Sequence, residues 1–199
     1  MNQRTRSLLL DCLIALALSI ILALGTQYTA NFIIGNYSAL TLLPLIWLAL
    51  RFGPPTAIVL ATITGIIIGI VQLGFSSWLT QVVEYILPLL FAGIAGLFAK
   101  YTQKTLNNRR YSSTYLNIVT AVALSTLVFM LTKFFLAPIA LGEISGLQIT
   151  SMEFWLSYVI LVVVMSVILI VMARSNPKLI IPKRTKYLSR KETSSLLND

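Results

Sequence analysis

Six long apolar segments, separated by short polar breaks, restrict the fold of this chain more than any other feature. They lie at about residues 7–25, 38–51, 55–73, 83–99, 114–137 and 153–173. A helix of about 20 apolar residues is long enough to cross the hydrocarbon core of a bilayer. Of the 199 residues, 57% are hydrophobic and only 11% are charged, too few to cover a water-facing surface. The sequence therefore predicts an all-α integral membrane protein with six transmembrane helices.

The basic residues predict the orientation of these helices. Fourteen of the 15 lysines and arginines fall in alternate breaks and at the two ends of the chain. The other breaks, residues 26–37, 74–82 and 138–152, contain none, and Lys133 lies near the outer end of the fifth segment. Because cytoplasmic loops carry the excess of lysine and arginine, both termini are expected in the cytoplasm.

The chain is long enough for one membrane domain, and we assign residues 1–175 to the six helices. Residues 176–199 are interpreted as a basic cytoplasmic tail, solvated and attracted to anionic lipid headgroups. A net charge of +9 is compatible with nucleic-acid binding, but the tail has no interleaved aromatic residues to support it.

The residue types that are missing exclude several classes of function. The chain has no histidine, so the commonest metal ligand and the commonest proton-transfer group are both absent, and a single cysteine, Cys12, allows no thiolate cluster. No nucleotide-binding glycine loop or metal-ligand cluster is present either. We therefore expect no catalytic residue, no metal and no cofactor, and a protein that binds a ligand without driving transport itself.

Glu84 is the most informative ionisable residue. It lies near the outer end of the fourth segment, and an ionised group at membrane depth costs at least about 2.5–3.5 kcal/mol on insertion scales. This predicts a carboxylate that faces a pocket open to the outside and accepts a proton or a cation from a ligand. The alternative is an interfacial glutamate wetted by headgroup water.

Aromatic and amide residues near the outer helix ends accompany Glu84 and complete the candidate binding site. Its other members are Asn36, Tyr37, Trp78, Gln81, Tyr85, Lys133, Trp155 and Tyr158. The aromatic rings would stack on a flat heterocycle, and the amides would supply neutral hydrogen bonds. Lys133 would snorkel outward or pair with Glu84 or Glu153. The alternative for the aromatic residues is an anchoring belt at the bilayer interface.

Small residues form a stripe on the first helix, at Ala15, Ser19 and Ala23. Such stripes let helices approach closely in lipid, and the partner is either another helix of this chain or a second membrane subunit. Asp11, in the cytoplasmic half of the same helix, is expected to pair with Arg4 or Lys100.

Three stretches carry a more specific pattern. They are Thr41-Leu42-Leu43-Pro44-Leu45 with Leu50-Arg51-Phe52-Gly53, then Gln81-Val82-Val83-Glu84-Tyr85-Ile86-Leu87, then Ala92-Gly93-Ile94-Ala95-Gly96-Leu97-Phe98-Ala99. This pattern resembles the thiamine-specific substrate-binding subunits of energy-coupling factor transporters. The resemblance implies a six-helix subunit of the Gram-positive plasma membrane that captures a vitamin from outside. It also implies docking, through Ala15 and Ser19, onto a coupling protein and two ATPases, and contact of Glu84 with thiamine.

The chain departs from that family at several positions. The family's histidine on the fifth helix has no counterpart in Lys133-Phe134-Phe135-Leu136-Ala137, and Thr64 stands where a tryptophan is usual. The tyrosine and asparagine of the sixth helix are not recognisable; Phe154-Trp155-Leu156-Ser157-Tyr158 is the nearest stretch. Thiamine is the leading ligand, followed by a related cationic or pyrimidine-like precursor. A subunit for another vitamin, or a structural membrane protein without transport activity, remains the alternative, and an enzyme is the weakest one.

Overall fold

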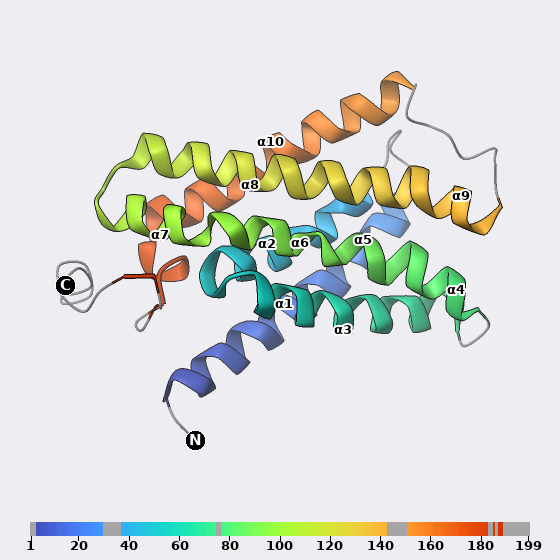
Figure 1. The fold of residues 1–199 in the computed structure, drawn as a ribbon, viewed down its shortest axis with the longest axis horizontal. Helices are drawn as coiled ribbons and strands as arrows, with labels where there is room; N and C mark the ends of the chain where they lie inside the picture. Colours follow the sequence, from blue (N-terminus) through green and yellow to red (C-terminus); the bar gives the residue numbers. More distant parts are fainter. Residues whose placement is uncertain are drawn as a thin grey trace.

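The computed structural model describes residues 3–29, 37–74, 77–142, 151–182, 185 and 187–188, and it is a bundle of helices (Figure 1). The first three passes are α1 (Gln3–Thr29), a 3-10 turn η1 (Ser38–Thr41) continued by α2 (Leu42–Phe52), and α3 (Pro54–Leu73). The fourth pass consists of α4 (Trp78–Thr80), η2 (Gln81–Ile86), α5 (Leu87–Leu90), α6 (Ala92–Ala95), η3 (Gly96–Phe98) and α7 (Ala99–Asn107). The last two are α8 (Tyr111–Leu131) with η4 (Thr132–Leu136) and α9 (Ala137–Leu141), and α10 (Met152–Ser175), which the 3-10 turn η6 (Pro177–Leu179) follows.

Each predicted apolar segment corresponds to one helical pass, so the prediction of a six-helix membrane bundle is confirmed. Among the described residues, five passes are long and apolar enough to cross a membrane, and the pass Ser38–Phe52 is apolar but shorter. This short pass lies inside the bundle, where Leu42, Leu45, Ile46 and Leu48 are fully buried. A helix that is apolar on all sides is expected to be enclosed by other helices.

The turn between α2 and α3 depends on glycine at two positions. Gly53 has φ 94°, a left-handed conformation that favours glycine, and the ring of Pro54 then starts α3 at a position where no backbone donor is needed. Gly96 packs on this turn so closely that a Cβ atom would clash with the Pro54 nitrogen. The fourth pass is thereby held against the turn.

One end of the bundle gathers the basic turns. The start of α1, the α2–α3 turn, the α7–α8 turn and the end of α10 all lie at the left of Figure 1. Arg51, Arg109, Arg110, Arg174 and Lys178 belong to these segments. The spatial arrangement thus agrees with an orientation that places this end, with both ends of the helical bundle, in the cytoplasm.

The small-residue stripe of α1 faces other helices of this chain, which favours the alternative of internal packing for these residues. Ala15 and Ser19 are fully buried and Ala23 is 6% exposed. Helix α1 packs there against η1, α2 and α3, so the small side chains permit a close approach within this chain. The side of α1 that faces outward carries large apolar residues, among them Leu13 and Ile21, which are 61% and 63% exposed.

Asp11 is paired, but with a different partner from those predicted. Its carboxylate accepts a hydrogen bond of 2.9 Å from Nε of Arg51, and both side chains are largely buried. Lys100 is exposed, and the side chain of Arg4 lies outside the described residues. Because Arg51 lies in the last turn of α2, this ion pair joins the cytoplasmic halves of the first two passes.

The first part of the tail packs on the bundle, so the prediction of a solvated tail is wrong for this segment. Arg51 donates to the carbonyl oxygens of Lys178 and Leu179, the latter at 2.7 Å, and Nε1 of Trp47 donates to Leu179 at 3.0 Å. Ile180 and Ile181, which follow, are buried. Further along, the hydroxyl of Thr185 donates to Oε1 of Gln103 at 2.6 Å; Nε2 of Gln103 donates to the carbonyls that end α2.

Ending the chain after Ser175 is expected to lower the midpoint of thermal unfolding of the purified protein. The shortened chain lacks the carbonyls that Arg51 and Trp47 bind, and it exposes the apolar surface that Ile180 and Ile181 cover. The matched control ends after Leu188 and keeps these contacts. Equal midpoints for the two shortened chains would show that the packed segment contributes no stability.

Candidate ligand pocket

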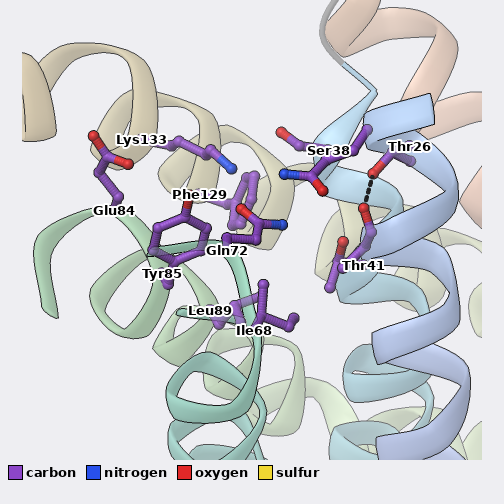
Figure 2. Close-up of a pocket in the computed structure, with 12 residues that line it drawn as sticks. Thr26, Ser38, Thr41, Ile68, Gln72, Glu84, Tyr85, Leu89, Phe129 and Lys133 are labelled. Carbon is purple, nitrogen blue, oxygen red and sulfur yellow. Dashed lines mark hydrogen bonds between the residues drawn. The ribbon is translucent and has the colours of Figure 1, made fainter. Parts of the chain in front are cut away.

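A cavity of about 190 Å³ lies between the outer ends of five helical passes, opposite the basic turns. Figure 2 shows the residues that line it. From α1, η1 and α3 come Ala23, Thr26, Gln27, Ser38, Thr41, Ile68 and Gln72. From the fourth and fifth passes come Glu84, Tyr85, Leu89, Phe129 and Lys133. The pocket therefore has one uncharged polar wall and one wall that carries both charges.

The two charged residues both lie in π-helical segments, which two prolines explain. Pro88 and Pro138 are each the second residue of the α-helix that follows a π segment. Proline has no backbone N–H, so the carbonyl four residues earlier, at Glu84 or Phe134, lacks its α-helical donor. The wider π turn accommodates this loss, and π segments are frequent at functional sites. Here η2 and η4 contact each other, which brings Glu84 and Lys133 to the same wall.

Aromatic rings form the base of the charged wall. Nζ of Lys133 lies 5.5 Å from the centre of the Tyr85 ring and 5.9 Å from that of Phe129, both within the range of cation–π attraction. Figure 2 shows the lysine side chain reaching from η4 into the pocket, with the Tyr85 ring beneath it and Glu84 on the side of η2. The charges of Glu84 and Lys133 are close enough to interact. This wall thus offers one anionic group, one cationic group and two ring faces.

The opposite wall offers hydroxyl and amide groups without charge. Thr26 uses its hydroxyl to donate to the carbonyl of Ala23 at 3.0 Å, as drawn in Figure 2. The hydroxyl of Ser38 is buried and has no hydrogen-bond partner within the described part of the chain. A buried polar group without a partner loses free energy, so a ligand that hydrogen-bonds to Ser38 would be favoured.

Three residues of the predicted site, Glu84, Tyr85 and Lys133, are brought together in this pocket. Ala23, predicted to take part in docking, lines it as well. Asn36 falls outside the described residues. Tyr37 is partly buried against the core and is not among the described residues that line the cavity.

Four other predicted residues are placed elsewhere. Gln81 is buried, and its Nε2 donates to the carbonyl of Ile66 on α3 at 3.2 Å. Trp78 is 71% exposed and Trp155 is 46% exposed on the outside of the bundle, as an interfacial belt requires. Tyr158 donates its hydroxyl proton to the carbonyl of Ala123 and stacks edge-on against Trp155. These side chains are therefore not pocket residues in this structure.

The polar wall was missed by sequence reasoning. Gln72 gives the best signal in retrospect, because an amide near the end of an apolar helix, where two glycines already mark close packing, is unusual. Thr26, Ser38 and Thr41 carry no such signal, since threonine and serine near helix ends commonly satisfy backbone groups. Ile68, Leu89 and Phe129 resemble any other apolar residue of a span.

A family comparison decides which class of membrane protein this is. The model of the family described as "Thiamine transporter protein (Thia_YuaJ)" matches residues 9–181, most of the chain. The chain belongs to the thiamine transporter protein family. The resemblance to thiamine-specific substrate-binding subunits of energy-coupling factor transporters is thus confirmed, and the chain is a multi-pass membrane transport protein rather than an enzyme.

A solved structure shows the same fold. The chain is similar to ThiT from Listeria monocytogenes with a TM-score of 0.70 and 19% sequence identity, over 91% of this chain and 100% of that chain. At this identity the match establishes the arrangement of the helices and not the residues of the site. No curated protein matches the sequence.

Proposed function

We propose that the pocket captures thiamine from outside the cell, and that Glu84 is its principal polar contact. The observation that carries the proposal is that one cavity, at the end opposite the basic turns, is lined by a carboxylate, an ammonium group and two aromatic rings. Thiamine is a flat, cationic heterocycle, so a carboxylate attracts its positive charge or accepts from its amino group. Tyr85 and Phe129 supply surfaces on which such a ring stacks.

Lys133 has a second role in this proposal. In the ligand-free protein its ammonium group lies over the same ring faces that an incoming cationic ring would use. We infer that the lysine side chain swings toward the uncharged wall when thiamine enters. Gln72 and Ser38, on that wall, then supply neutral hydrogen-bond partners.

The subunit is proposed to act with a shared module of one transmembrane coupling protein and two ATPases, in the plasma membrane of a Gram-positive bacterium. The energy for transport would come from the ATPases, since this chain contains no nucleotide-binding glycine loop. A partner that meets α1 would touch its outward side, near Leu13 and Ile21, because Ala15 and Ser19 are enclosed.

Isothermal titration of the purified protein tests the ligand. Thiamine is expected to bind tightly and with a single site, whereas its pyrimidine precursor alone, which lacks the cationic ring, is expected to bind at least about tenfold more weakly. Equal affinities would show that the cationic ring is not recognised. Binding of neither compound would contradict the proposed ligand and favour another heterocyclic vitamin.

A further inference from the structure

We propose that Gly65, Gly69 and Gln81 are positioning residues that hold η2 against α3 in the register that turns Glu84 and Tyr85 into the pocket. This inference rests on the proposed function of the pocket and extends it to residues that do not touch the ligand. It concerns the contact between η2, which carries Glu84 and Tyr85 of the charged wall, and α3, which carries Ile68 and Gln72 of the opposite wall.

The two glycines let the backbone of η2 lie directly on α3. A Cβ atom on Gly65 would be 2.8 Å from the Cα of Ile86 and 2.9 Å from the carbonyl oxygen of Tyr85. A Cβ atom on Gly69 would be 2.6 Å from Cγ of Gln81. Real Cβ atoms do not approach other atoms this closely, so a side chain at Gly65 would push the backbone of η2 away from α3, and one at Gly69 would displace the side chain of Gln81.

Gln81 fixes the register of this contact. It is the first residue of η2 and is 4% exposed, with its stem over Gly69 and its Nε2 bonded to the carbonyl of Ile66 at 3.2 Å. No water competes for such a bond inside a membrane protein, so its loss leaves a buried amide donor unsatisfied. A slide or rotation of η2 along α3 would break it.

The register matters because Glu84 and Tyr85 follow Gln81 within a single π turn. Pro88 removes the α-helical donor of the Glu84 carbonyl and so favours the π turn, but it does not fix where that turn lies along α3. The contact with α3 supplies the missing constraint. A displacement of about 1 Å at a binding group is enough to weaken an oriented interaction strongly.

The proposal assigns a different role to Gln81 from the direct ligand contact that the sequence suggests. Its amide is turned toward α3 and away from the cavity, so it acts through the residues that follow it. Gly65 and Gly69, which from the sequence resemble ordinary packing glycines, become determinants of the ligand site.

The first test is a double-mutant cycle on thiamine affinity. Gly69→Ala is expected to weaken binding by about tenfold or more, because the new methyl group displaces Gln81 and with it Glu84. In a Glu84→Gln background, Gly69→Ala should reduce the affinity much less, because the contact of the Glu84 carboxylate with thiamine is already lost. Additive effects of the two substitutions, or no effect of Gly69→Ala on wild-type binding, would overturn the proposal.

Rescue distinguishes a clash with a side chain from a clash with backbone. Gln81→Ala removes the Cγ atom that the Gly69→Ala methyl meets, so the pair of substitutions should recover part of the affinity. Gly65→Ala meets the backbone of Tyr85 and Ile86 and should not be rescued by Gln81→Ala. Gly93→Ala is the matched control: it meets a flexible side chain, Ile58, away from the pocket, and should leave the affinity unchanged.

A measurement without ligand tests the contact between η2 and α3 even if thiamine is the wrong ligand. In a Cys12→Ser chain that carries Glu84→Cys, the reaction rate of the thiol with a small methanethiosulfonate reagent reports the environment of position 84. Gly69→Ala should change this rate at least about threefold, and Gly93→Ala should not. Equal rates with and without Gly69→Ala, including no reaction in either, would reject the positioning role independently of thiamine binding.

Discussion

Replacing Glu84 by glutamine is expected to weaken thiamine binding by at least about tenfold while the protein stays folded. The side chain is close in shape, but it loses the negative charge that lines the pocket together with Lys133. A hydrogen bond to a charged group contributes about 1.5–3 kcal/mol, which corresponds to roughly a ten- to 150-fold change in affinity. Isothermal titration of the purified variant with thiamine measures the effect.

Glu153→Gln provides the matched control for this substitution. Glu153 lies in the first turn of α10 near the same membrane surface, is exposed, and is not among the described residues that line the cavity. Its replacement removes the same charge and should leave affinity within about twofold. If Glu84→Gln binds thiamine as the wild type does, Glu84 is not a ligand contact and the site assignment is wrong.

Replacing Arg51 by alanine is expected to cost about 2–4 kcal/mol of stability, the largest loss we predict for a single residue outside the pocket. The guanidinium group binds Asp11 on α1 and the carbonyls of Lys178 and Leu179. It also lies 5.9 Å from the centre of the Trp47 ring. The substitution leaves the Asp11 carboxylate largely buried without a counter-ion, and the midpoint of thermal unfolding should fall by at least about 5 °C.

Arg174→Ala, which removes an exposed basic residue at the same end of the bundle, should shift the midpoint by less than about 2 °C. Thiamine affinity should change little in either variant, because the pocket lies at the opposite end. Equal midpoints for Arg51→Ala and Arg174→Ala would show that the ion pair and the tail contacts do not stabilise the bundle.

The ionisable members of the site are visible in the sequence for a physical reason. A carboxylate or an ammonium group inside an apolar run is costly in a membrane, so Glu84 and Lys133 each indicate a function or a partner. The structure brings both to one wall of one cavity. Asp11 gives the same kind of signal, but its partner Arg51 lies 40 residues away, and only the packing of α1 beside α2 identifies it.

Aromatic residues do not give an equally clear signal. Tyr85, Trp78 and Trp155 are all expected near the membrane surface, where a ring serves equally well in a pocket or in an interfacial belt. In the structure only Tyr85 lines the cavity, and the two tryptophans are exposed. The pocket's hydroxyl residues were missed because serine and threonine near helix ends have many local roles.

The sequence alone determined the six passes and the two charges at the end opposite the basic turns, because each depends on the cost of placing polar groups in lipid. The tertiary structure decided which face of each helix turns inward. Lipid and protein core are equally apolar, so the lipid-facing and inward-facing sides of a membrane helix have similar hydropathy. Hydropathy therefore cannot predict which face turns inward. For this reason the apolar pattern located all six helices, but it did not show that the stripe of Ala15 and Ser19 is enclosed or that Gln81 faces α3.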